Sequence, residues 1–316
     1  MFNTFLSLIN VVNSPDESAL LPAYLEGVYP VLKEHFTDYE IILVNNLPGR
    51  QLNKDLENLP PAIKQHLFIL NLSSKTNKNH AFVAGLDRAN GDYTIIFEFD
   101  FYQQPGLILD LFRKTQEHYD IVYLQAGRRV TRPQFRWLYG IFYSILRRYS
   151  NLRIDDKAHN TRIISRRALN SLLRLRENLR YMKAIYSIVG YNTTSIPTDQ
   201  PIQDEDTGFR ERFGASLVAI SSFTTFLSSV LLWIFIISLL FLIVVIINAL
   251  KVKFAGFDLL GNPQEAVTGW TFLVVLMSIF FAITCLNLYI MSIYLANIYH
   301  EIKKRPLYII ESVQRL

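Results

Sequence analysis

The sequence predicts an α/β domain with a mostly parallel sheet and helices on both faces, followed by an interfacial amphipathic helix and two transmembrane helices. In residues 1–205, short apolar runs alternate with helical patterns, which is typical of such a sheet. Beyond them, 213–250 and 266–299 contain 38 and 34 residues without a charge. A mean hydropathy of +0.18 fits this mixture of a globular domain and apolar helices.

Strands of the α/β domain are expected where a short apolar run ends in polar or turn-forming residues. Between the first two runs, Ser-Pro-Asp-Glu at 14–17 is typical of a helix start, with proline and acids in the first turn. A second helix is expected at 79–89 before a C-cap at Asn90-Gly91, and Pro105 opens a third. The predicted strands are 6–12, 39–46, 66–72, 92–100 and 119–125.

Polar side chains follow three of these strands and predict where the chemistry lies. In sheets of this kind, ligands bind beyond the carboxyl ends of the strands. We therefore expect a site along the edge that holds Asn13, Asn45, Asn46, Glu98 and Asp100. Two carboxylates two residues apart on a strand share a face, and such oxygen ligands suit a hard divalent cation. A solvated turn is the alternative interpretation of Glu98 and Asp100.

Other chemistries find little support in the sequence. Neither G-x-G-x-x-G nor G-x-x-x-x-G-K-[ST] occurs, which argues against dinucleotide and P-loop sites. The single cysteine, Cys285, excludes a disulfide framework and a Cys-rich zinc site. The histidines His80, His118 and His159 show no metal-ligand spacing, and no Ser-His-Asp arrangement is readable.

The two uncharged runs predict membrane helices, because a helix needs about 20 apolar residues to cross the hydrocarbon. Two buried core helices are the alternative. The short apolar run at 5–12 has no basic residue before it, so no signal peptide is expected. The predicted parts are a cytosolic domain at 1–209, an interfacial helix at 210–227, transmembrane helices at 228–250 and 270–296, an extracytoplasmic loop at 251–269 and a cytosolic basic tail at 297–316.

Basic residues near the ends of the spans predict the orientation. Five lie on the side of the two termini and two in the connecting loop, which favours both termini in the cytosol of a multi-pass inner (plasma) membrane protein. Small residues in the second run, among them Ser278 and Ala282, offer helix-packing sites for a homo-oligomer, or for the two spans against each other. The basic residues are Arg210, Arg212, Lys303, Lys304 and Arg305 against Lys251 and Lys253.

Positive charge is concentrated in residues 128–183, which hold 15 Lys and Arg against three acids. The overall net charge of +5 therefore combines +12 in this segment with −7 elsewhere. Aromatic and basic residues alternate over 128–149 with an apolar helical face, which favours a helix on anionic lipid headgroups. An amphipathic helix with a solvated basic side is the alternative, and no motif supports nucleic-acid binding.

Three segments, 81–108, RIISRRAL at 162–169 and IYHEIKKRPLYII at 298–310, carry a resemblance to a known family. The chain resembles the membrane-bound family 2 glycosyltransferases that load a sugar onto polyprenyl phosphate, such as dolichol-phosphate mannose synthases and bacterial undecaprenyl-phosphate glycosyltransferases. The resemblance runs nearly end to end. It implies a GT-A-like fold, a nucleotide-sugar donor, a polyprenyl phosphate acceptor, Mg²⁺ or Mn²⁺, inverting transfer, and a homo-oligomer such as a tetramer.

The chain departs from the family at several motif positions. Where the family has paired acids after the second strand, this chain has Asn45 and Asn46. The first acid of the D-x-D motif is lengthened to Glu98, and a metal-binding glutamine corresponds to Tyr102. The proposed catalytic base corresponds to Asn160, whose amide cannot accept a proton at neutral pH.

The resemblance nevertheless assigns roles to residues of this chain. The lipid phosphate is itself the nucleophile and is largely ionised, so positioning and charge neutralisation could carry much of the rate. A catalytically degenerate paralogue that binds a lipid or a partner is the alternative, and a small transporter is disfavoured by having only two spans. The implied sets are Asp100, Asn160 and Arg162 for catalysis; Asn13, Asn45, Asn46, Lys78 and Glu98 for the nucleotide-sugar; Arg128, Arg129 and Arg162 for the lipid phosphate; and Asp100 and Glu98 for the metal.

Overall fold

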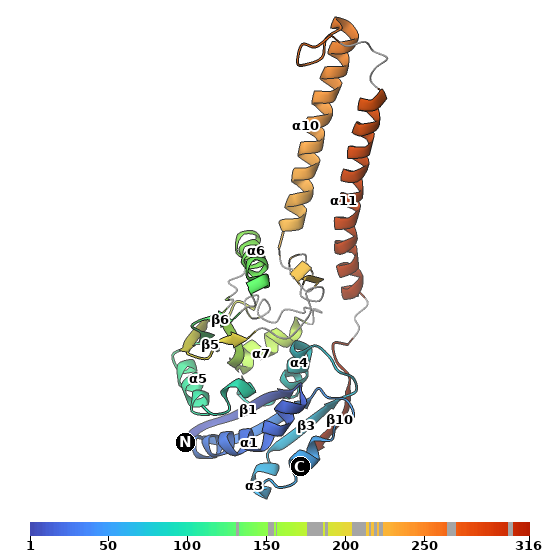
Figure 1. Ribbon diagram of the computed structural model, residues 1–316. Helices are drawn as coiled ribbons and strands as arrows, with labels where there is room; N and C mark the ends of the chain where they lie inside the picture. Colours follow the sequence, from blue (N-terminus) through green and yellow to red (C-terminus); the bar gives the residue numbers. More distant parts are fainter. Residues whose placement is uncertain are drawn as a thin grey trace.

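An α/β domain and a long helical hairpin that rises from it make up the chain (Figure 1). The computed structural model describes residues 1–130, 133–150, 155, 157–175, 186, 189–203, 213–214, 216–217, 220, 224–263, 270–302 and 306–316.

The domain is built on an eight-stranded mixed sheet in the order β10-β3-β2-β1-β4-β7-β5-β8. The first four strands along the chain pair in parallel, as predicted, but β7 runs antiparallel to both of its neighbours. The sheet is therefore mixed but, as predicted, mostly parallel, since β7 and β10 run opposite to the other six strands. Its strands are β1 (Phe2–Val12), β2 (Phe36–Asn45), β3 (Leu67–Leu72), β4 (Tyr93–Ile96), β5 (Ile121–Ala126), β7 (Ala158–Ser165), β8 (Thr193–Thr198) and β10 (Ile310–Arg315); β6 (Arg129–Val130) and β9 (Ile202–Gln203) form a separate pair.

Helices cover both faces of the sheet, as the alternating pattern predicted. One buried apolar cluster joins the sheet to α1 (Pro15–His35) and α5 (Leu107–Thr115). A second cluster joins the opposite face to α4 (Lys78–Arg88) and α7 (Arg166–Arg174). Two short helices, α2 (Leu52–Asp55) and α3 (Pro61–Lys64), lie between β2 and β3.

The predicted helix start at 14–17 is confirmed by a complete capping box. The Ser14 hydroxyl accepts a hydrogen bond from the Glu17 backbone N–H at 3.2 Å. The Glu17 carboxylate in turn accepts from the backbone N–H of Asn13 at 2.6 Å and of Ser14 at 3.2 Å. Each bond satisfies a donor that a helix N-terminus leaves without a partner, so the chain leaves β1 in a fixed direction.

The predicted strand at 92–100 is wrong at its carboxyl end. β4 ends at Ile96, and Phe99–Phe101 forms a 3₁₀ turn closed by the Phe101 N–H donating to the Glu98 carbonyl at 3.2 Å. The chain must leave the sheet here to enter α5. Glu98 is consequently buried while Asp100 is exposed, so the two carboxylates do not share a strand face.

Two long helices, α10 (Phe226–Ala255) and α11 (Trp270–Ile302), lie side by side in the hairpin (Figure 1). At its base, Phe142 of α6 (Pro133–Tyr149) packs on a small cluster around Ile220 and Ile290. Within the residues that the structure describes, no helix is both long and apolar enough to cross a membrane. Half of the interfacial helix predicted at 210–227 lies outside the described residues.

The C-terminal segment forms a strand that the sequence analysis did not predict. β10 pairs antiparallel with β3 and becomes an edge strand of the sheet. Side chains reinforce the pairing, since Asn71 Nδ2 donates to Ser312 Oγ at 3.0 Å and Asn53 Nδ2 donates to Gln314 Oε1 at 2.6 Å. Part of the predicted basic tail therefore belongs to the α/β domain.

Candidate functional site at the carboxyl edge of the sheet

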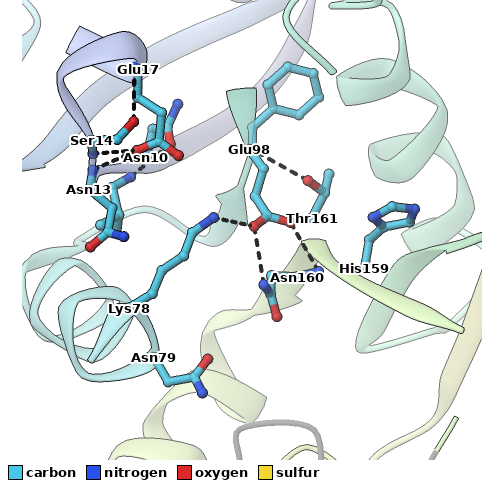
Figure 2. Close-up of polar contacts among 12 residues, drawn as sticks. Asn10, Asn13, Ser14, Glu17, Lys78, Asn79, Glu98, His159, Asn160 and Thr161 are labelled. Atoms are coloured by element: carbon cyan, nitrogen blue, oxygen red, sulfur yellow. Dashed lines mark hydrogen bonds and ion pairs between the residues drawn. The ribbon is translucent and has the colours of Figure 1, made fainter. Parts of the chain in front are cut away.

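The predicted polar edge exists, and α4 adds a lysine to it. Because β1, β2, β3 and β4 are parallel, their carboxyl ends meet at one side of the sheet. Asn13 follows β1, while Glu98 follows β4 (Figure 2). Lys78, the first residue of α4, extends its side chain between these two elements (Figure 2). Sequence reasoning thus located the edge correctly.

Glu98 is the centre of the contacts at this edge. Its Oε1 lies 3.0 Å from Lys78 Nζ and accepts from Asn160 Nδ2 at 3.1 Å (Figure 2). Its Oε2 accepts from the Asn160 backbone N–H at 3.2 Å, and its own N–H donates to Thr161 Oγ1 at 3.1 Å. Both carboxylate oxygens are thus engaged by protein donors, and Asn160 serves as a donor rather than as a base.

The ion pair stays charged at neutral pH. Burial disfavours the Glu98 carboxylate, but the Lys78 ammonium and the Asn160 amide outweigh it, so the pKa of Glu98 is lowered. Burial also opposes the charge of Lys78, yet the carboxylates of Glu98, Glu17 and Asp100 hold the pKa of Lys78 above its ordinary value. The edge therefore has a fixed ammonium beside a fixed carboxylate.

Asn45 and Asn46, predicted to bind the donor, use their amides inside the protein. Asn46 Nδ2 donates to Asn13 Oδ1 at 2.7 Å and to the Thr76 carbonyl at 2.9 Å, while its Oδ1 accepts from the Thr76 N–H. A carboxylate in this place could not donate these two bonds. The amide is therefore matched to a role in fixing the loops of the edge.

Asn45 has an equivalent internal role. Its Nδ2 donates to Asn71 Oδ1 and to the Arg50 carbonyl, both at 2.8 Å, and its Oδ1 accepts from the Leu47 N–H at 3.1 Å. Its side chain is buried, as is that of Asn46. These contacts favour a structural role for both asparagines over direct recognition of a nucleotide.

Arg162, predicted to bind phosphate, is only 2% exposed. Its Nε donates to the Asn160 carbonyl at 3.1 Å, and its Nη2 donates to the His159 carbonyl at 2.6 Å. The guanidinium carbon lies 3.8 Å from the centre of the Tyr186 ring. This geometry favours a positioning role for Arg162, because it holds the backbone that presents Asn160 to Glu98. No local pattern in the sequence identifies Tyr186 as its partner.

The other two arginines predicted to bind lipid phosphate lie on a different segment. Arg128 is exposed, and its carbonyl accepts from the Ile202 N–H at 3.3 Å. Arg129 begins β6. Among the described contacts, none joins Arg128 to the ion pair of Lys78 and Glu98. The phosphate-binding role of both residues stays a prediction.

Asp100 is held through its backbone by residues that the sequence analysis did not select. Gln200 Nε2 donates to the Asp100 carbonyl at 3.1 Å, and the Gln200 carbonyl lies 3.1 Å from His159 Nε2. The His159 ring packs edge-on against Phe101. Partial burial and the Glu98 charge raise the pKa of Asp100. The 3₁₀ turn is therefore connected to β7 and to the segment after β8.

Comparisons with known proteins agree with this architecture. Residues 17–173 match the family described as Glycosyl transferase family 2. A protein named uncharacterized glycosyltransferase sll0501, from Synechocystis, is 30% identical over 314 residues, covering 94% of this chain and 95% of that one. The chain belongs to glycosyltransferase family 2. The bactoprenol glucosyl transferase of Shigella phage SfII is 26% identical over 98% of each chain.

Solved structures resemble this member of the family less closely. Glucosyl-3-phosphoglycerate synthase of Mycobacterium tuberculosis, crystallised with Mn²⁺ and UDP, is 14% identical over 69% of this chain and 78% of that one. Its TM-score is 0.43.

The two-carboxylate metal site predicted for this family member does not fit the residues present. Both oxygens of Glu98 accept bonds from Lys78 and Asn160. Among the described residues, no group of three or more His, Cys, Asp or Glu side chains could hold a metal ion. Asp100 remains as one exposed carboxylate, so the protein would supply a cation with few of the oxygen ligands that it prefers.

Proposed function

We propose that the chain transfers a sugar from a nucleotide-sugar donor to polyprenyl phosphate. The observation that carries this proposal is the extent of the likeness to relatives named bactoprenol glucosyl transferase, which spans 98% of this chain. The likeness therefore covers the helical hairpin as well as the α/β domain. Bactoprenol is a polyprenol, so its phosphate offers both an anionic nucleophile and a long apolar tail.

The chemistry of such a transfer suits an edge without a free general base. The lipid phosphate is a dianion near neutral pH, so it can attack the anomeric carbon of the sugar without first losing a proton. In-line attack would invert the configuration at that carbon and release a nucleoside diphosphate. Positioning and charge neutralisation can supply much of the rate. The amide at Asn160 is therefore compatible with activity.

The proposal includes attachment to the plasma membrane, with both termini in the cytosol. It rests on the uncharged runs 213–250 and 266–299, and on large apolar side chains that α10 and α11 expose, such as Trp233 at 63% and Phe281 at 72%. A bilayer would remove this surface from water. Trp137, exposed on α6 near the hairpin base, suits the headgroup region.

The proposal also includes assembly of the chain into homo-oligomers. The mass of the detergent-solubilised particle tests this part of the proposal.

Transfer of a radiolabelled sugar tests the proposed reaction. Membranes that contain the full chain are mixed with undecaprenyl phosphate, Mg²⁺ and Mn²⁺, and each common nucleotide-sugar in turn. We expect one donor to give an organic-extractable, labelled lipid that membranes without the protein do not form. Absence of such a lipid from every donor would refute the proposed function.

A lipid- or partner-binding protein without catalysis is the second candidate. The observation that favours it is the amide of Asn160 at the position where the family has an acid. Calorimetric titration of the purified chain with UDP and GDP distinguishes the two candidates. A catalyst must bind its nucleotide, so the absence of binding to either would favour the non-catalytic protein.

A further inference from the structure

At the carboxyl edge of the sheet, the Lys78 ammonium interacts with three carboxylates, those of Glu98, Glu17 and Asp100. Asn45, Asn46 and Asn160 are neutral amides, and each is committed to a protein contact. Glu98 is neutralised by Lys78 at 3.0 Å. Asp100 is the one further carboxylate that the 3₁₀ turn presents. Glu17, the third carboxylate near Lys78, accepts bonds from the N–H groups of Asn13 and Ser14. A divalent cation that reaches this edge therefore finds Glu17 and Glu98 already bound to protein donors, whereas a diphosphate finds the Lys78 ammonium.

Lys78 has the capacity to contact such a diphosphate. An ammonium group has three N–H donors, and the ion pair with Glu98 Oε1 takes one of them. Its side chain is 25% exposed, so part of it reaches the surface of the edge. Glu98, itself held by two bonds from Asn160, fixes the position of Nζ beside the ends of β1 and β4 (Figure 2). The lysine is therefore oriented before any ligand arrives.

We propose that Lys78, and not a divalent cation, contacts the donor diphosphate, so that this chain transfers sugar without a metal. The inference rests on the proposed function. In the step, the bond from the anomeric carbon to the diphosphate oxygen breaks, and a bond from that carbon to a lipid phosphate oxygen forms. The leaving diphosphate keeps the electron pair and gains one negative charge. The lipid phosphate loses one negative charge, so no proton or oxidant is needed.

Glu98 and Asn160 hold Lys78 in position in this arrangement. Glu98 cannot ligate a metal while both of its oxygens accept protein bonds, but it can hold Lys78 in place. Asn160 directs two N–H groups at Glu98, and Arg162 holds the carbonyl of Asn160 at 3.1 Å. Glu98, Asn160 and Arg162 are thus positioning residues for the Lys78 ammonium.

The first experiment removes metal from the full-length protein. The purified, detergent-solubilised chain is treated with excess EDTA and assayed with undecaprenyl phosphate and the active nucleotide-sugar, with EDTA still present. We expect activity to fall by less than about threefold, whereas a required metal would cost more than about 100-fold. Loss of activity in EDTA that added Mg²⁺ or Mn²⁺ restores would overturn the inference and leave the proposed function standing. No product under either condition would overturn both.

The second experiment removes the ammonium without leaving Glu98 unpaired. The double variant Lys78→Met/Glu98→Gln keeps the approximate shape of both side chains and removes both charges. We expect it to lose about 10²- to 10³-fold in activity, with no rescue by Mn²⁺. The single variant Glu98→Gln, which keeps the ammonium, should lose less than about tenfold. A double variant as active as the wild-type chain in EDTA would overturn the inference.

Two controls accompany these variants. Lys114→Met removes the same charge from an exposed site on α5, where Lys114 pairs with Glu117, and should keep full activity. Lys78→Arg keeps a cation at the edge and should be more active than the double variant. Unfolding midpoints of all variants are measured in the same detergent, which separates a loss of fold from a loss of charge neutralisation.

Discussion

Replacing Lys78 by methionine leaves the Glu98 carboxylate buried without its counterion, and the structure sets the size of the effect. Removing one partner of a buried ion pair typically costs about 3–5 kcal/mol. The Lys78 side chain is 25% exposed, and Asn160 still donates two hydrogen bonds to Glu98. We therefore expect Lys78→Met to lower the free energy of unfolding by about 2–3 kcal/mol.

The pH dependence of this loss has a definite sign. In the wild-type chain the folded-state pKa of Glu98 is lowered, so its stabilising contribution is present above the unfolded-state pKa and declines as the pH falls through the folded-state value. In Lys78→Met, burial without the ammonium should raise that pKa above the unfolded-state value. The variant is then destabilised most at neutral pH. The difference between its free energy of unfolding and that of the wild-type chain shrinks as the pH falls.

Urea unfolding of the detergent-solubilised full chain, followed by circular dichroism between pH 7 and the acid range, measures both effects. Adding Glu98→Gln to Lys78→Met should recover most of the lost stability at neutral pH, because no buried charge remains. Lys114→Met serves as the control for removal of an exposed lysine. An unchanged unfolding free energy in Lys78→Met, or a double variant no more stable than the single one, would refute the reasoning.

Three further predictions address the supporting contacts and the hairpin. Arg162→Met removes the hydrogen-bond donors of the His159 and Asn160 carbonyls, so it should destabilise the chain by about 2–4 kcal/mol in the same urea assay. Tyr186→Phe keeps the ring and should change the free energy of unfolding by less than about 0.5 kcal/mol. Equal effects of the two variants would contradict the assigned contacts. Asn46→Asp places a carboxylate against the two oxygens that now accept from Asn46, those of the Asn13 side chain and the Thr76 carbonyl. It should lower the free energy of unfolding by about 1–3 kcal/mol at neutral pH and by less in acid, where the carboxylate is protonated. A loss of thermal stability that does not depend on pH would count against this. The full chain should stay in the membrane pellet after carbonate washing, and recovery in the supernatant would exclude membrane insertion.

Sequence patterns predicted those parts of the fold that depend on neighbouring residues. The apolar runs located β1, β2, β3 and β5, and the Ser-Pro-Asp-Glu motif located the start of α1. The carboxyl edge followed from these strands, because parallel strands bring their ends together. Local composition was therefore sufficient for the half of the sheet that contains the candidate site.

Contacts between distant residues escaped prediction. The direction of β7 depends on its pairing with β4 and β5, which no local pattern encodes. The 3₁₀ turn at Phe99–Phe101 depends on the path into α5, so the alternation of 92–100 was misread as a continuous strand. The partners of Arg162 are backbone carbonyls and one ring, and therefore leave no signature at Arg162 itself.

The strand β10 has a mechanical consequence for the whole chain. β9 precedes α10 in the sequence and β10 follows α11, so the hairpin is connected to the α/β domain at both of its ends. A domain on a single linker can swivel about it, whereas two connections leave it far less rotational freedom. In a bilayer, these two connections would therefore fix the angle at which the carboxyl edge of the sheet faces the lipid surface.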